Sequence, residues 1–205
     1  MKVLIVGAHG KIGKIISKKM SDSETYSPVA FIRKEEQKAY FNDINVPTVV
    51  SSLEYSIDAL KDIIKDFDAV VFTAGSGGST GDDKTLEIDL DGAVKTMIAA
   101  KDAGVNRYVI VSAAYADDRE FWNSASIKPY YIAKHYADLY LKNSGLDYTI
   151  LRPVALTDDP AQDSLVFLET DGKLNKQVSR ENVAILVLEV LPDATHFKKV
   201  HEFSN

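Results

Sequence analysis

Apolar positions along the chain follow two patterns that alternate. Short segments rich in apolar residues predict strands, over residues 3–6, 29–32, 47–50, 69–72, 108–111, 148–151 and 200–203. The first of them is apolar without alternation, as expected of a strand covered on both faces. Apolar residues three or four positions apart predict helices between them, over residues 12–20, 57–64, 86–98, 129–142 and 182–191. This alternation favours an α/β fold, a Rossmann-like doubly wound parallel sheet flanked by helices on both faces, in a single domain over residues 1–205.

Length and composition fit that fold and exclude several classes of protein. The chain has 205 residues, 45% hydrophobic and 26% charged, which is enough for one layered core. A net charge of -6 and the absence of cysteine argue against broad nucleic-acid binding, disulfides and thiolate metal sites. No signal-peptide pattern begins the chain, and no apolar run approaches the roughly 20 residues that span a bilayer. We expect a cytoplasmic monomer or homodimer with a small-molecule substrate and neither nucleic acid nor membrane as partner.

A glycine-rich turn follows the first predicted strand directly. Glycines at 7, 10 and 13 allow a tight turn, close approach of backbone to a pyrophosphate, and helix packing, while the helix N-terminus supplies N–H donors. A sharp strand-to-helix turn without a ligand is the alternative. We expect a dinucleotide phosphate cradle made of Gly7, His9, Gly10, Lys11, Ile12 and Gly13.

The end of the 29–32 strand favours NADP (NADPH) over NAD. NAD-binding proteins place a carboxylate there for the ribose 2'-hydroxyl, whereas this chain has Arg33 and Lys34, which suit a 2'-phosphate. A solvated charged loop is the alternative, because Glu35 and Glu36 follow at once. After the 69–72 strand, the glycine-rich loop 73–81 is expected to border the adenosine and pyrophosphate or to be merely flexible. The residues assigned to the cofactor from this loop are Thr73, Ala74 and Gly75.

Tyr130 and Lys134 are the main catalytic candidates. They stand four residues apart at the start of the predicted 129–142 helix and share one face of it. A phenol with a pKa of about 10 needs a nearby cation before its phenolate is accessible. Lys134 would supply that cation and could also bond the nicotinamide ribose. A surface lysine beside a tyrosine packed on the sheet is the alternative.

With these two motifs in place, the chain resembles the atypical short-chain dehydrogenase/reductases. That group includes NAD-dependent epimerase-like, NmrA-like and flavin reductase-like NAD(P)-binding proteins. Four further segments carry the resemblance, 84–93, 109–112, 151–157 and 178–184. The resemblance implies that the backbone of Pro153, Val154, Ala155 and Leu156 lies along the nicotinamide.

The same resemblance implies a catalytic set of Asp89, Ser112, Tyr130 and Lys134, with two departures. Asp89 stands where the family has an asparagine, and the family's serine aligns with either Ser112 or Ala114. The set is therefore incomplete. Fewer donors at the substrate carbonyl would weaken transition-state stabilisation unless a backbone group compensates.

The function implied is an NADPH-dependent oxidoreductase that transfers hydride to a small carbonyl, quinone or flavin-like acceptor; a non-catalytic NADP(H)-sensing module is the alternative. Only about 50 residues follow the 148–151 strand, which leaves a small substrate-side segment, about 154–180, and argues against epimerisation of nucleotide sugars. Phe121 and Trp122, with residues 165–168, could cover a flat or apolar substrate; alternatively, the two aromatic residues anchor a loop or form a dimer contact. No metal is expected, because neither His9, a turn residue near the phosphate, nor His135, expected at the surface of its helix, has other metal ligands nearby.

Overall fold

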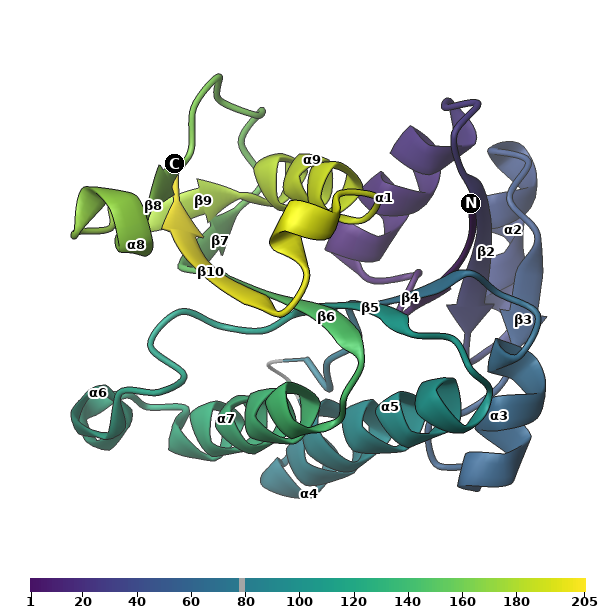
Figure 1. Cartoon of the computed structure of the whole chain (residues 1–205), viewed down its shortest axis with the longest axis horizontal. Helices are drawn as coiled ribbons and strands as arrows, with labels where there is room; N and C mark the ends of the chain where they lie inside the picture. Colours follow the sequence, from purple (N-terminus) through teal and green to yellow (C-terminus); the bar gives the residue numbers. More distant parts are fainter. Residues whose placement is uncertain (78–79) are drawn as a thin grey trace.

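A central sheet of eight strands separates two layers of helices (Figure 1). The computed structural model of the chain describes residues 1–77 and 80–205. The strands are β1 (Lys2–Val6), β2 (Ser27–Ile32), β3 (Thr48–Val50), β4 (Ala69–Phe72), β5 (Arg107–Val111), β6 (Asp147–Pro153), β8 (Val166–Phe167) and β10 (Lys199–Ser204). They lie in the order β3-β2-β1-β4-β5-β6-β10-β8. All neighbours pair in parallel except β8, which runs antiparallel to β10.

The helices cover both faces because each carries one apolar side. Above the sheet in Figure 1 lie α1 (Lys11–Ser21) and α9 (Arg180–Val190), and below it lie α3 (Ile57–Ile64), α5 (Ala93–Asp102) and α7 (Lys128–Asn143). Each layer closes its own apolar core, with Ile16 and Val187 in the first and Leu60 and Met97 in the second. The shorter segments are η1 (Glu35–Gln37), α2 (Lys38–Asp43), α4 (Asp82–Lys84), η2 (Thr85–Gly92), α6 (Arg119–Ser124), α8 (Leu168–Asp171) and η3 (Ala194–His196).

The Rossmann-like fold predicted from the apolar pattern is confirmed. The helix over 57–64 and the strand over 69–72 have the predicted bounds, and β10 joins the sheet beside β6. The single helix predicted over 86–98 is instead α4, η2 and α5 in succession, with π-helical turns in η2. The sheet is parallel as predicted except for β8, an additional edge strand that runs antiparallel to β10.

The part of the chain after β6 adds structure that the pattern did not predict. Strands β7 (Ala155–Thr157) and β9 (Gln177–Ser179) form a separate two-stranded sheet, and β8 with α8 lies at the edge beyond β10 (Figure 1). A substrate-side role for residues 154–180 remains a prediction.

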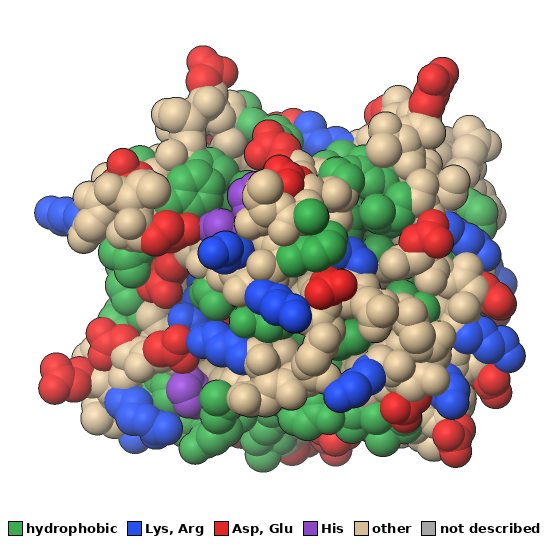
Figure 2. All heavy atoms as spheres, viewed as in Figure 1, with side chains coloured by type: hydrophobic (Ala, Val, Ile, Leu, Met, Phe, Trp, Pro, Cys, Tyr) green, Lys and Arg blue, Asp and Glu red, His purple; other side chains and the backbone are tan. Residues whose placement is uncertain are grey.

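Charged side chains of both signs are interspersed over the surface, and apolar side chains gather along the lower rim (Figure 2). On α7, Tyr136, Leu139 and Tyr140 recur at helical spacing and are partly exposed. Among the helices that the structure describes, none is both long enough and apolar enough to cross a membrane.

Candidate functional site

The glycine turn joins β1 to α1 with a geometry that only glycine tolerates. Gly7 has φ +81°, and a Cβ there would come 2.5 Å from the Cα of Ala74. A Cβ on Gly13 would come 2.6 Å from the carbonyl oxygen of Gly7, so α1 packs directly on the turn. Within the described chain, no side chain caps the first turn of α1, and this turn holds no acidic residue. Its N–H groups therefore remain suited to an anion such as a pyrophosphate.

A cavity of about 350 Å³ opens beside this turn, at the carboxyl ends of the strands where dinucleotides bind in such sheets. It is bordered by three groups of residues, from the glycine turn, from the end of β2 and the loop after β3, and from the loop after β4. The lining includes Gly7, His9, Gly10, Arg33, Gln37, Ser51, Ser52, Glu54, Thr73, Ala74, Gly75 and Ser76. Glycine turn, uncapped helix and cavity together fit a bound dinucleotide.

Arg33 and Lys34 diverge at the end of β2. Arg33 lines the cavity, as do Ser51 and Ser52, whereas the Lys34 ammonium pairs with Glu36 at 3.5 Å, between exposed side chains. Burial, with the charges of Lys14 and Arg33, lowers the pKa of His9 and favours its neutral form. Of the two basic residues, Arg33 is the one that lines the cavity.

The other residues predicted for the phosphate cradle, Lys11, Ile12 and Gly13, lie next to the turn. In the part of the chain that the structure describes, they are not among the residues that line the cavity. Ile12 packs against the core, and Lys11 extends away to the carboxylate of Asp158, 2.6 Å distant. The same carboxylate accepts from Arg180 at 2.6 Å. Lys11 thus ties the glycine turn to the segment after β7, while its backbone stays in the first turn of α1.

The loop after β4 forms the inner wall of the cavity. Thr73 donates through its hydroxyl to the carbonyl oxygen of Val6 at 3.1 Å, which fixes the loop against β1. Ala74 and Gly75 follow along the wall. The expected course of the 73–81 loop can be followed only in part, because residues 78 and 79 lie outside those that the structure describes.

Tyr130, Lys134 and Asp89 come together below this wall. Lys134 Nζ lies 5.4 Å from the centre of the Tyr130 ring and 3.1 Å from Asp89 Oδ1. Tyr130 is partly buried, whereas the lysine and the aspartate are 3% and 1% exposed. Asp89 Oδ2 accepts the backbone amide of Ser76 at 2.9 Å, so Asp89 links the trio to a residue that lines the cavity.

The electrostatics of this trio differ from the expectation drawn from Tyr130 and Lys134 alone. Burial raises the pKa of the Tyr130 phenol; the Lys134 ammonium opposes that shift, and Asp89 and Asp138 add to it. Burial works against the charge of Lys134, but Tyr130, Asp89 and Asp138 hold its pKa above the ordinary value. The pair is therefore a neutral phenol beside a charged ammonium.

Ser112 lies apart from the trio, inside a second buried network. Its hydroxyl donates to Asp138 Oδ2 at 2.9 Å, and the same oxygen accepts from Arg152 Nε at 2.9 Å. Burial raises the pKa of Asp138, although Arg152 and Ser112 oppose the shift. Ala114, the other candidate, offers no hydroxyl, and its amide donates to Pro153. With its hydroxyl held by a carboxylate, Ser112 does not stand free to bind a carbonyl.

The segment after β6 continues from the carboxyl end of that strand into β7. Pro153 ends β6 and Val154 donates its amide to Phe203 at 3.1 Å, while Ala155 and Leu156 enter β7. Their backbone thus continues from the carboxyl end of β6. A nicotinamide beside it remains a prediction.

The aromatic residues before α7 anchor a loop. Trp122 is 2% exposed and donates through Nε1 to the carbonyl of Tyr115 at 3.0 Å, so it packs beneath the loop. Phe121 lies between two tyrosines, with ring centres 4.5 Å from Tyr115 and 5.2 Å from Tyr131. His135, expected as a surface position, is largely buried and bonds Asp117 at 2.9 Å. In the described part of the chain, no three His, Asp or Glu side chains are arranged to hold a metal ion.

Sequence reasoning missed Asp138 and Arg152. A signal existed for the first, because Asp138 follows Lys134 by one helical turn and therefore shares its face. Arg152 precedes the strand-ending proline and interrupts an apolar strand, which is unusual for a charged residue.

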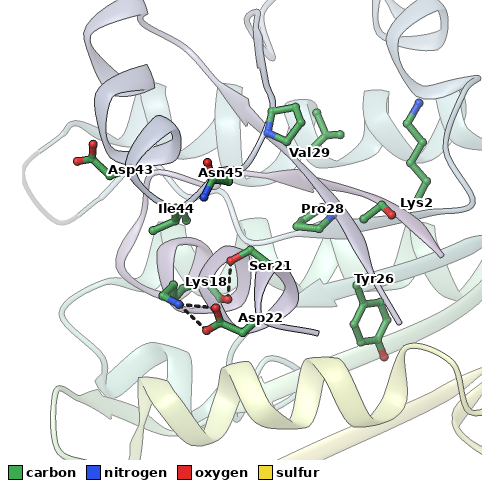
Figure 3. A pocket seen from close by; sticks show the side chains of 12 residues that line it. Lys2, Lys18, Ser21, Asp22, Tyr26, Pro28, Val29, Asp43, Ile44 and Asn45 are labelled. Atoms are coloured by element: carbon green, nitrogen blue, oxygen red, sulfur yellow. Dashed lines mark hydrogen bonds and ion pairs between the residues drawn. The ribbon is translucent and has the colours of Figure 1, made fainter. Parts of the chain in front are cut away.

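A separate cavity of about 600 Å³ lies at the opposite edge of the sheet, where β1 and β2 begin (Figure 3). Lys18 and Asp22 pair with each other within it, as the dashed lines in Figure 3 mark. Because dinucleotides bind at the carboxyl ends of parallel strands, this cavity is not the cofactor site.

Comparison with known proteins agrees with this geometry. A Bacillus subtilis protein named an uncharacterized sugar epimerase, YhfK, is 50% identical over 160 residues, which cover 78% of this chain and 74% of that protein. The solved structure of the oxidoreductase YlbE from Lactococcus lactis matches with a TM-score of 0.89 and 34% identity, covering 100% of this chain and 91% of that one.

A short-chain dehydrogenase/reductase from Veillonella parvula, solved in complex with NADP, has a TM-score of 0.80 at 19% identity and covers 100% of this chain and 94% of its own; it shows the fold alone. A family model described as NAD(P)H-binding matches residues 7–194, from the glycine turn to the last helical segment. Because that match spans nearly the whole fold, the chain belongs to the NAD(P)H-binding family, with relatives named as an epimerase and an oxidoreductase.

Proposed function

We propose that the protein is an NADPH-dependent reductase that delivers hydride to a small carbonyl, quinone or flavin-like acceptor. The observation that carries this proposal is the connection between the dinucleotide cavity and a proton-donating pair. Ser76 lines the cavity and binds Asp89, which in turn contacts Lys134 beside Tyr130. A dinucleotide site coupled to a phenol is suited to hydride transfer accompanied by proton transfer.

Arg33 supports NADPH as the cofactor. Arg33 lines the cavity together with Ser51 and Ser52, and a guanidinium there can bind a phosphate through charge-assisted hydrogen bonds. Glu54 also lines the cavity, but the Lys84 ammonium pairs with it at 2.7 Å and offsets its charge.

In this mechanism each part of the chain has a separate task. The first turn of α1 binds the pyrophosphate, and Arg33 binds the 2'-phosphate. A reduced nicotinamide supplies the hydride when it is bound. Tyr130 donates a proton through its hydroxyl to the acceptor oxygen, and Lys134 stabilises the phenolate that remains.

Replacing Tyr130 tests the catalytic assignment. We expect Tyr130→Phe to lower the rate of carbonyl reduction by about 10²- to 10⁴-fold, the usual contribution of general acid catalysis, with unchanged NADPH affinity. Tyr136→Phe, a change at a partly exposed tyrosine on the same helix, is the matched control. A Tyr130→Phe variant that reduces every accepted carbonyl at the parent rate would remove Tyr130 from the mechanism.

Two single variants, Arg33→Ala and Lys34→Ala, test the preference for NADPH over NADH. Loss of a charged hydrogen bond costs about 1.5 to 3 kcal/mol, so Arg33→Ala should weaken NADPH binding roughly 10- to 150-fold and leave NADH binding unchanged in calorimetric titration. Lys34→Ala, at the neighbouring position whose ammonium faces Glu36, should change neither affinity much. An equal loss of NADPH and NADH affinity in Arg33→Ala would contradict the 2'-phosphate role.

A non-catalytic NADP(H) sensor is the second candidate, and the engagement of Ser112 favours it. Its hydroxyl is held by Asp138, so a donor to the substrate carbonyl is lacking at that position. On this alternative the protein binds NADPH but reduces none of a panel of carbonyls, quinones and flavins. Tight NADPH binding together with no turnover would favour the sensor over the reductase.

A further inference from the structure

Asp89 stands at the junction between the dinucleotide cavity and the Tyr130–Lys134 pair. Its Oδ2 accepts the Ser76 amide at 2.9 Å, and its Oδ1 lies 3.1 Å from Lys134 Nζ. A Cβ on Gly75 would come 3.1 Å from Oδ1, so the glycine leaves room for this carboxylate against the loop. One carboxylate therefore holds both the cavity wall and the ammonium.

Three buried titratable side chains act on the Tyr130 phenol. Lys134 is opposed by the acidic side chains of Asp89 and Asp138, and none of the three is more than 3% exposed. An ammonium favours a neighbouring phenolate only as far as nearby carboxylates leave its field uncancelled. Burial and the two carboxylates together outweigh Lys134, so the pKa of Tyr130 lies above its usual value.

We propose that Asp89 is a positioning residue that, by pairing with Lys134, weakens the effect of the ammonium on the Tyr130 phenol and so, together with burial, keeps that phenol protonated as the proton donor. This inference rests on the proposed reductase function and deepens it by assigning what controls the protonation state of the donor. A protonated phenol can give a proton to the acceptor, whereas alcohol oxidation needs the phenolate as its base. Without the charge of Asp89, Lys134 would lower the pKa of the phenol, and the phenolate would form at lower pH.

The step balances in atoms and charge. Hydride, with its electron pair, leaves C4 of the reduced nicotinamide and forms a C–H bond at the carbonyl carbon. The π electrons of the carbonyl move to its oxygen, which takes the proton of the Tyr130 hydroxyl. The nicotinamide is oxidised, the carbonyl is reduced to an alcohol, and solvent returns a proton to the Tyr130 phenolate.

Asp89→Asn tests the proposal, since it removes the charge and retains an oxygen for the Ser76 amide. We expect the Tyr130 phenol to titrate about 1 to 3 pH units lower in this variant than in the unaltered protein. The midpoint is measured from tyrosinate absorbance as a function of pH in dinucleotide-free protein. Subtracting the absorbance of the corresponding Tyr130→Phe variant isolates the contribution of Tyr130. Alcohol oxidation with NADP should become active at correspondingly lower pH.

Two variants control for loss of charge and for loss of structure. Asp91→Asn removes a charge two residues away, from an exposed carboxylate that pairs with Lys95 at 2.8 Å, and should leave the Tyr130 titration unmoved. Asp89→Glu keeps the charge and should titrate close to the unaltered protein. An Asp89→Asn protein whose Tyr130 titrates at the unaltered midpoint overturns the proposal.

The outcomes separate this inference from the proposed function. If Asp89→Asn does not fold, the unaltered protein compared with Tyr130→Phe still decides, because a Tyr130 midpoint at or below that of an ordinary tyrosine contradicts the role of Asp89. A protein that reduces no acceptor refutes the reductase function. The phenol titration needs neither dinucleotide nor acceptor, and it decides the role of Asp89 in either case.

Discussion

Removing the Lys134 ammonium while keeping Asp89 should destabilise the fold strongly. The two side chains are 4% and 1% exposed with their charged atoms 3.1 Å apart, so Lys134→Met leaves a carboxylate buried without its counter-charge. Breaking a buried pair in this way costs about 3 to 5 kcal/mol. That is a large part of the roughly 5 to 15 kcal/mol by which such a domain is stable.

Adding Asp89→Asn to Lys134→Met should recover much of the loss. The double variant buries no unpaired charge at this position, and the asparagine oxygen can still accept the Ser76 amide. We expect it to be at least about 2 kcal/mol more stable than Lys134→Met alone, because removing both members of a buried pair is far less costly than removing one. If the two substitutions acted independently, the double variant would instead be less stable than Lys134→Met.

Equilibrium unfolding in urea measures each free energy by linear extrapolation. Trp122, the chain's single tryptophan, is 2% exposed and provides the fluorescence signal. The matched control is Lys95→Met, because Lys95 pairs with the exposed carboxylate of Asp91. We expect this change to lower the free energy of unfolding by at most about 1 kcal/mol. A Lys134→Met loss no larger than that of the control, or a double variant less stable than Lys134→Met, would refute the reasoning.

Two further predictions concern the backbone at Gly7 and the dependence of the free energy of unfolding on pH in acid. Gly7→Ala should destabilise the fold by more than about 1 to 2 kcal/mol, because the left-handed φ alone costs that much and its Cβ would also meet Ala74; urea unfolding measures the loss and calorimetry the accompanying loss of NADPH binding. Burial opposes ionisation of Asp117, but Arg152 and Lys142 hold its pKa well below the usual range. Its ionised form therefore stabilises the fold above the unfolded-state pKa of about 3.9, and this contribution is lost as pH falls towards the folded value. Asp117→Asn should make unfolding free energy less steep in pH below about 4, and an unchanged slope would contradict this.

The apolar pattern predicted the sheet because parallel strands buried on both faces leave an unambiguous signal. The unbroken runs at 69–72 and 108–111 became the central strands β4 and β5, and the glycine turn lies where β1 meets α1. The antiparallel β8 has two residues, Val166 and Phe167, which are too few for any periodicity. The π-helical η2 was equally hidden, since apolar residues three or four apart fit either helical pitch.

The candidate site could be predicted only where its residues are neighbours in sequence. Tyr130 and Lys134 share a helix face by spacing alone, whereas the contact between Asp89 and Lys134 joins two helices. Within η2 the buried positions are Thr85, Asp89 and Gly92, so the acid lies in register with small or polar residues on the inward face. That register gives a signal for a buried carboxylate, but not for its partner.

Stability alone does not account for the charges near the cavity, as a comparison with Arg107 makes clear. Arg107 lies at the opposite end of β5, where its guanidinium donates to the carbonyls of Leu191 and Asp147 and closes the C-terminal end of α9. Burial lowers its pKa to about 10, and it remains charged at neutral pH. At the amino end of β5, a single cation hydrogen-bonded to backbone carbonyls is therefore sufficient to hold α9 against the sheet. The carboxyl edge instead buries Asp89 against Lys134, a pair that apolar residues of similar volume often replace without loss of stability, so the proposed control of a proton accounts for this pair better than stability does.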